Sequence, residues 1–225
     1  MSNTSNEKAE KGSKFWIQKI VNENFYNKKF EEIFGAKLKF LSPLESESFK
    51  EYQLREAKIL SSVLGLTKIE FDEKFSFWAK NQPHWDAIAT SADEKILYLF
   101  EVKAHLKELQ SKISATNKNS IEKITTSMQK VFEKISAGTN ANFQTWTEKY
   151  YQLGNRFTFL HNMNQMHFPK IQRTILILLN IIDDKTYIAT SKANWQFHYQ
   201  KVFWEMTGKI QPPENVQIIY FGENL

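Results

Sequence analysis

The spacing of apolar residues along the chain predicts several helices. Residues 15–34 carry a loose helical pattern that fits one helix or two short ones. Residues 48–64 carry a clearer apolar stripe, which Ser48 and Glu51 would open as a capping box and Gly65 would end. Further helices are predicted over 120–135, 142–164 and 195–204.

Shorter apolar runs predict the strands. Three consecutive strands are expected over 69–79, 84–90 and 96–103, with the polar residues 91–95 as the turn between the last two. The almost wholly apolar run 171–182 predicts a buried central strand, and 216–221 a final strand. Strands before the middle helices and a buried strand after them predict an α/β fold, with helices flanking a mixed β-sheet.

The predicted hairpin brings charged residues together at one end. If its turn is centred between residues 93 and 94, antiparallel pairing places Asp86 directly opposite Glu101. Lys103 lies two residues beyond Glu101 and therefore points to the same face. A register slip of one residue would separate these side chains, so the prediction depends on the turn.

This trio matches the needs of metal-assisted phosphodiester cleavage. Two carboxylates can hold a divalent ion through hard oxygen ligands, and a nearby lysine can orient water or offset charge in the transition state. A charged strand end that merely reaches solvent is the alternative, and a lone Glu-x-Lys would favour it. The apolar run 96–100 favours the metal-binding site over the solvent-exposed strand end, because acids on a buried strand need partners.

Composition narrows the possibilities without deciding between them. The 225 residues suffice for one sizeable core, and we expect a disordered tail over 1–14 and a single domain over 15–225. The net charge of +5 fits a polyanionic partner, although a composition rich in Lys and Asn gives the same charge without function. The chain has no cysteine, no apolar run of membrane-spanning length and no signal-peptide core, which predicts a cytoplasmic protein without disulfides or thiolate metal sites.

Other polar residues on the predicted helices are candidates for a site. Glu56 falls within the stripe of 48–64, where it either binds a metal, or reaches solvent or pairs with Arg55 or Lys58 at the surface. Gln152, Asn155 and Arg156 cluster beside the apolar stripe of 142–164, with Arg156 as a candidate phosphate contact and a solvated face as the alternative. The chain has 7 glycines and no glycine-rich phosphate loop, which argues against a nucleotide cofactor.

Three motifs in order resemble a known family. The chain resembles the PD-(D/E)xK nuclease superfamily, with its restriction-endonuclease-like fold, and more narrowly a group of small, largely uncharacterised bacterial proteins of that superfamily. The motifs that carry the resemblance are Trp85-Asp86-Ala87, Glu101-Val-Lys103-Ala-His105 and Tyr150-Tyr-Gln152-Leu-Gly-Asn155-Arg156. Two departures are Trp85, which stands where the superfamily has proline, and Val102, which replaces an alanine of the narrower group.

The resemblance implies a core in the order helix, three-stranded meander, helix, strand, and a role for each motif residue. It implies that Asp86 and Glu101 bind Mg²⁺, for which Mn²⁺ can substitute, and that Glu56 is a further acid near the ion. It implies that Lys103 orients or activates water. Gln152, Asn155, Arg156 and His105 are implied to line the site, with a structural role for His105 equally open.

Three functions are compatible with these observations. The leading expectation is a Mg²⁺-dependent nuclease that acts on nucleic acid, with DNA favoured over RNA. A homodimer is one possible form of this nuclease, and no membrane association is expected. The alternatives are a catalytically silent nucleic-acid binder and a partner-binding module on the same fold. Salt-dependent binding without metal-dependent turnover would identify the second, and co-purification with a partner the third.

Overall fold

A five-stranded mixed sheet forms the centre of the computed structural model, which describes residues 8–222. The strands lie in sequence order: β1 (Leu38–Ser42), β2 (Ala87–Ser91), β3 (Ile96–Lys103), β4 (Arg173–Ile181) and β5 (Val216–Phe221). The first three form an antiparallel meander, whereas β4 runs parallel to β3 and β5 runs parallel to β4. The predicted α/β class and mixed sheet are therefore confirmed.

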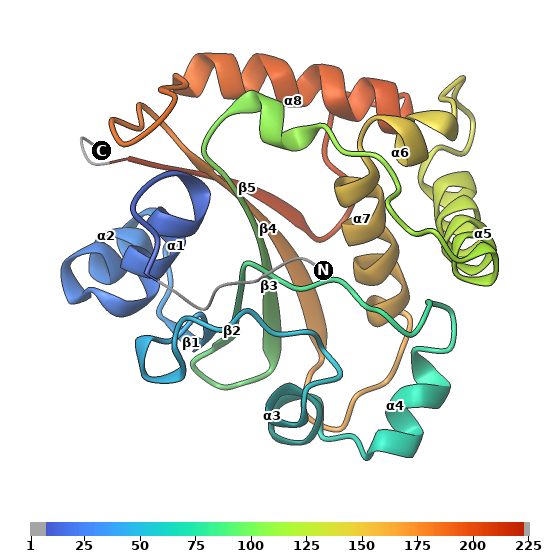
Figure 1. Cartoon of the computed structure of the whole chain (residues 1–225), viewed down its shortest axis with the longest axis horizontal. Helices are drawn as coiled ribbons and strands as arrows, with labels where there is room; N and C mark the ends of the chain where they lie inside the picture. The colour runs from blue at the N-terminus through green and yellow to red at the C-terminus, as the bar shows by residue number, and fades with distance from the viewer. Residues whose placement is uncertain (1–7, 223–225) are drawn as a thin grey trace.

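Helices cover both faces of this sheet (Figure 1). The helices α1 (Gly12–Asn22) and α2 (Asn24–Phe34) pack on one face. The other face is covered by α3 (Ala57–Ile59) with the π-helical turn Leu60–Leu64, α4 (Lys68–Lys74), α5 (Lys118–Ile135), α6 (Gln144–Glu148), α7 (Tyr151–Asn164) and α8 (Lys192–Thr207). No helix among the described residues is long and apolar enough to cross a membrane.

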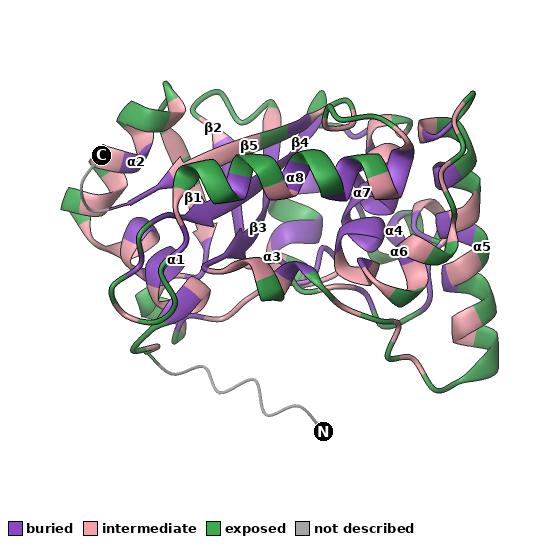
Figure 2. Ribbon diagram, turned by 90° about the horizontal axis from the view of Figure 1, so that it is seen from above, coloured by how far each residue is buried: buried purple, intermediate pink, exposed green. Residues whose placement is uncertain are grey.

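The alternation of side chains along β3 explains how one strand serves two cores. Tyr98, Phe100 and Val102 pack in the cluster beneath α1 and α2, whereas Leu97 and Leu99 belong to the larger cluster on the opposite face. The same alternation directs Glu101 and Lys103 toward the larger cluster. In Figure 2 the buried residues concentrate in the sheet and α7, while much of α8 is exposed on its outer side.

The predicted helix over 48–64 is largely wrong. Ser48 and Phe49 both have positive φ angles, of 54° and 56°, so the backbone there is not helical and the proposed capping box does not form. Tyr52 instead makes an isolated antiparallel bridge to Trp85. Helical structure begins only at Ala57 and ends, as predicted, before Gly65, which has a φ of 70°.

The predicted strand over 69–79 is also wrong, because α4 occupies its first half. A capping box does exist here, between Thr67 and Glu70. Phe71 and Phe75 stack at 4.1 Å, and their spacing of four residues is helical rather than strand-like. The first strand of the meander is instead β1, which the apolar pattern did not identify.

The remaining elements follow the predictions more closely. Residues 15–34 fall in two helices, α1 and α2, and α1 begins at Gly12, so the last residues of the predicted tail are helical while residues 1–7 lie outside the described part. The predicted helix over 142–164 is divided into α6 and α7, since Tyr150 between them has a non-helical backbone, with φ −128° and ψ 44°, and bridges to Ser111. The helices α5 and α8 and the strands β4 and β5 lie where they were expected.

Candidate functional site

The candidate site lies at the end of β3, where a buried strand carries two charged side chains. Glu101 is 1% exposed and Lys103 is 6% exposed. β3 pairs with β2 on one edge as far as Phe100 and with β4 on the other edge through Lys103, so the ladder with β4 holds the end of the strand in place. A central strand of this kind fixes the two charges with little freedom to move.

The β2–β3 ladder has the register that the predicted turn gives, and Asp86 lies directly before its last pair. Ala87 pairs with Phe100 in the β2–β3 ladder, and the Asp86 backbone N–H donates to the Phe100 carbonyl at 3.2 Å. The side chain of Asp86 then extends the ladder, because its Oδ2 accepts a hydrogen bond of 2.6 Å from the Val102 N–H. This bond orients the carboxylate beside Glu101.

Glu101 is held between two cations. Its Oε1 lies 2.5 Å from Lys103 Nζ, and its Oε2 accepts a 2.6 Å hydrogen bond from Arg156 Nε. Burial alone would raise the pKa of Glu101, but the charges of Arg156 and Lys103 outweigh burial and lower this pKa to about 2. Glu101 is therefore ionised throughout the physiological range.

The helix α7 supplies the polar side chains that complete the site. Arg156 stacks over the Trp85 ring at 4.4 Å and donates from Nη2 to the His84 carbonyl at 2.8 Å. Gln152 accepts a 3.2 Å hydrogen bond from Lys103 Nζ through its Oε1. The helix α7 thus brings Gln152 to Lys103 and Arg156 to Glu101.

Asn155 and His105 are close to these groups in sequence but make different contacts. Asn155 is buried and interacts with Tyr151 on the same helix. His105 lies 3.2 Å from Glu108 through Nε2, and its ring is 5.4 Å from that of Tyr187. The observed partners of His105 fit a structural role at the rim of the site.

Glu56 does not join this cluster, and a neighbouring acid does. Glu56 pairs with Lys50 at 3.0 Å, the surface arrangement that was the alternative reading of the sequence, although with a different cation. Glu51 instead lies within the field of Glu101 and Arg156, with burial raising its pKa and Lys14 and His84 opposing that rise. Because 48–64 is not a continuous helix, the acid near the site is Glu51 and not Glu56, which helical spacing had placed there.

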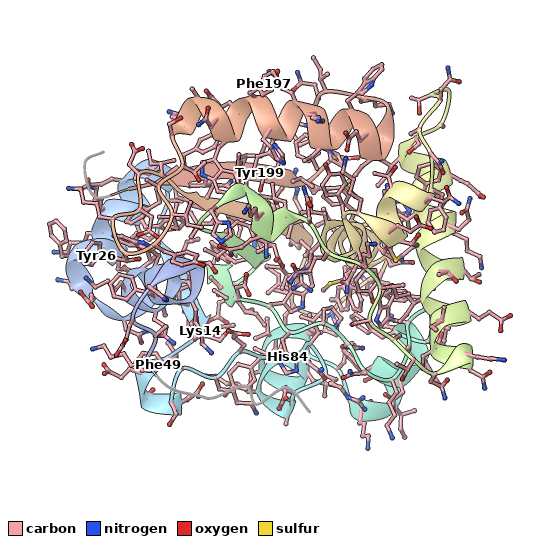
Figure 3. The ribbon with its side chains drawn as sticks, turned by 45° about the horizontal axis from the view of Figure 1, so that its top comes forward. Lys14, Tyr26, Phe49, His84, Phe197 and Tyr199 are labelled. Carbon is pink, nitrogen blue, oxygen red and sulfur yellow. The ribbon has the colours of Figure 1, made fainter. Side chains whose placement is uncertain are left out.

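Glu51 is approached from two sides. Lys14 of α1 lies 3.8 Å from its Oε1, and the ring of His84 is 3.3 Å from its carbonyl oxygen. Lys14 and His84 occupy the same side of the molecule in Figure 3. No sequence motif signalled Lys14, whereas His84 directly precedes Trp85-Asp86 and could have been considered.

Asp86 holds its proton more tightly than an ordinary aspartate. Burial raises the pKa of Asp86, and the charges of Glu101 and Glu51 raise it further against the opposing effect of Lys103, to about 7. The pKa of Lys103 is also raised, but by the neighbouring acids and against the effect of burial. Burial lowers its pKa, but Glu101 and Asp86 outweigh burial and raise it, so the ammonium group stays charged.

These residues fit a magnesium ion, although no ready-made group of three ligands exists. Among residues 8–222, no three acidic or histidine side chains are grouped so that they could hold a metal. Magnesium, however, commonly binds through one or two carboxylates and keeps several waters. A divalent ion held by Asp86 and Glu101 would offset both the burial and the repulsion from Glu101 that raise the pKa of Asp86.

Comparisons with protein-family models, curated proteins and solved structures find no match to this chain.

Proposed function

We propose that this protein is a divalent-metal-dependent nuclease that hydrolyses phosphodiester bonds, with DNA favoured over RNA. The observation that carries the proposal is the convergence of Asp86, Glu101 and Lys103 at the buried end of β3. Glu101 is paired with Lys103 and Arg156, whereas Asp86 forms no ion pair among the described residues. A buried carboxylate without a paired cation is costly to a fold, and a chemical role would account for keeping it.

The order of elements supports a restriction-endonuclease-like core. An antiparallel meander, β1 to β3, is followed by helices and then by β4, which is parallel to β3. The resemblance noted in the sequence implies the same order. The helix before the meander is α2 rather than the expected segment 48–64.

In the proposed reaction, Asp86 and Glu101 would hold Mg²⁺, with Glu51 as the further acid nearby. The ion, when bound, polarises the scissile phosphate and lowers the pKa of water. Asp86 must lose its proton to bind the ion, and the Val102 N–H keeps its carboxylate oriented toward Glu101. Arg156 holds the other oxygen of Glu101 and so fixes the direction of that carboxylate.

Lys103 is suited to orient water or the phosphate rather than to remove a proton. Its raised pKa keeps the ammonium protonated, which excludes general-base catalysis at neutral pH. Two of its three N–H donors are directed at Glu101 and Gln152. The third donor remains for a water molecule or a phosphate oxygen, whose negative charge grows in the transition state.

A cleavage assay tests the proposal. Wild type and Lys103→Ala are incubated with linear duplex DNA, single-stranded DNA and structured RNA, in Mg²⁺, Mn²⁺ or EDTA. Lys28→Ala, at an exposed lysine of α2, is the matched control. We expect metal-dependent cutting by wild type and the control, and at least about a 100-fold loss in Lys103→Ala. Cutting that survives in Lys103→Ala and in Glu101→Ala would refute the assignment of the site.

A further inference from the structure

A second cluster of cations lies in a cavity at the opposite end of the sheet, where β4 begins. The cavity has a volume of about 600 Å³, within the range of sites for small ligands. It is formed where α5 ends, α7 ends, β4 begins and the loop after α8 turns toward β5. Its basic lining residues are Lys134, His161, Arg173 and Lys209.

This cavity is distant from the candidate nuclease site. In the parallel β3–β4 ladder Arg173 pairs with Ile96, whereas Lys103 pairs with Asn180. Seven residues along a strand correspond to about 23 Å. The two sites therefore occupy opposite ends of the sheet, and a ligand in the cavity would not touch Asp86 or Glu101.

Each cation of the cavity is held by a neutral acceptor instead of a carboxylate. Arg173 donates from Nε to Asn215 Oδ1 at 2.6 Å, and Lys209 donates to the Ile135 carbonyl at 2.8 Å. Lys134 Nζ lies 3.4 Å from His161 Nε2. These contacts position the three cations without neutralising their charge.

The histidine is an acceptor in this arrangement. Burial lowers the pKa of His161, and the charge of Lys134 lowers it further against the opposing effect of Glu214. A neutral imidazole can accept a hydrogen bond from the ammonium group. Glu214 also lines the cavity, but among the described residues it forms no ion pair with Lys134, Arg173 or Lys209.

The rest of the lining is suited to an organic group attached to an anion. Phe157, Leu160, Pro212 and Pro213 form an apolar part of the wall, and Gln165 and Gln211 carry amide groups. Arg173 is fixed through Nε, which leaves its two terminal nitrogens for a bidentate contact of the kind that phosphate accepts. A flat ring against the apolar wall and a phosphate against the cations would together use both halves of the cavity.

We propose that this cavity binds a small phosphorylated ligand of nucleotide size, at a site separate from the candidate nuclease site. The sequence has no glycine-rich phosphate loop, so side-chain cations rather than backbone N–H groups would hold the phosphate. The proposal goes beyond the nuclease function and does not require it. A ligand bound here contacts α7, the helix that also carries Gln152 and Arg156.

Calorimetric titration in EDTA tests the site with defined probes: ATP, pyrophosphate and adenosine. The test variant is Lys134→Gln/Arg173→Gln, and its matched control is Lys28→Gln/Lys37→Gln, which removes the same charge from exposed positions. We expect ATP to bind wild type and the control within about twofold of each other. Loss of charge-assisted hydrogen bonds should weaken ATP binding at least about 10-fold in the test variant.

The other probes and variants separate the alternatives. Pyrophosphate should compete with ATP, and adenosine should bind far more weakly. Lys103→Ala should retain ATP affinity, because the candidate nuclease site is not the binding site. The proposal is overturned if ATP fails to bind at millimolar concentration, if the control loses as much affinity as the test variant, or if Lys103→Ala abolishes binding. Preference for a single-stranded oligonucleotide over ATP by wild type, lost in the test variant, would overturn the small-ligand assignment in favour of a nucleic-acid strand.

Folding of each variant is checked by thermal unfolding before titration. If Lys134→Gln/Arg173→Gln is unfolded, Lys134→Gln alone is used, since Lys134 is exposed on α5 and its replacement removes no core packing. This single variant is expected to weaken ATP binding about 10-fold. An unchanged affinity in it would equally overturn the proposal.

Discussion

The ion pair between Glu101 and Arg156 should be among the strongest pairwise interactions in the protein, and its strength follows from burial. Arg156→Met removes the guanidinium from a carboxylate that is 1% exposed. Breaking a buried pair in this way typically destabilises a protein by about 3–5 kcal/mol, because the remaining charge is left uncompensated. The variant also loses the hydrogen bond to the His84 carbonyl and the contact with Trp85.

The pKa of Glu101 gives an independent magnitude. Against burial, Arg156 and Lys103 lower this pKa from 4.5 to about 2, which at about 1.4 kcal/mol per pKa unit is roughly 3 kcal/mol. A lowered pKa means that this stabilisation is present above pH 4.5 and is lost as the pH falls through about 2. Arg156 and Lys103 share the effect, so we expect a coupling energy of about 2 kcal/mol between Glu101 and Arg156 at pH 7.

Urea unfolding of the double-mutant cycle measures this coupling. The cycle consists of wild type, Glu101→Gln, Arg156→Met and the double variant, each analysed for its free energy of unfolding. Lys39 and Glu94 provide the control cycle, since their charged atoms lie 2.5 Å apart, close to the 2.6 Å between Glu101 and Arg156, but their side chains are 60% and 50% exposed. The control coupling should be much smaller than that between Glu101 and Arg156, because solvent screens an exposed pair. Equal couplings in the two cycles, or one below about 0.5 kcal/mol for Glu101 and Arg156, would refute the argument from burial.

Three further predictions follow from the site and its supporting helix. Because Asp86 has a pKa raised to about 7 and must be ionised to bind a cation, Mn²⁺ affinity measured by calorimetry should increase from pH 6 to pH 8, and a flat profile would contradict this. Glu51→Gln should weaken Mn²⁺ binding whereas Glu56→Gln should not, since Glu56 pairs at the surface; the reverse order would restore the original assignment. Gly154→Ala should destabilise the fold by about 1–3 kcal/mol in thermal unfolding, because the new Cβ would lie 2.9 Å from Trp146, and unchanged stability would show that the helices separate easily.

The hairpin was predictable because strand periodicity and turn chemistry specify the same register. Alternation placed Asp86, Glu101 and Lys103 on one face once the turn was located, and the observed ladder has that register. Arg156 and Gln152 were found as a cluster at helical spacing. Their contacts with the hairpin could not be derived from the chain alone, because they depend on how α7 packs against β4 and β3.

The errors have an identifiable cause. Apolar spacing in 48–64 allowed a helix, but the bridge between Tyr52 and Trp85 and the positive φ of Ser48 and Phe49 impose an extended, turning chain instead. Tertiary contacts of this kind override a local preference that is worth only a fraction of a kcal/mol per residue. Selecting Glu56 over Glu51 was a direct result, since the choice of acid assumed helical geometry.

The long connection between β3 and β4 has a consequence for folding. Ile96 pairs with Arg173, 77 positions later, whereas the β2–β3 hairpin closes over a turn of only a few residues. Pairing between distant segments forms slowly because it requires the closure of a long loop. We therefore expect Glu101 and Lys103 to be brought together with Asp86 early, and to meet Arg156 only when the second half of the chain docks. Hydrogen exchange during refolding should protect the amides of β2 and β3 before those of β4 and α7.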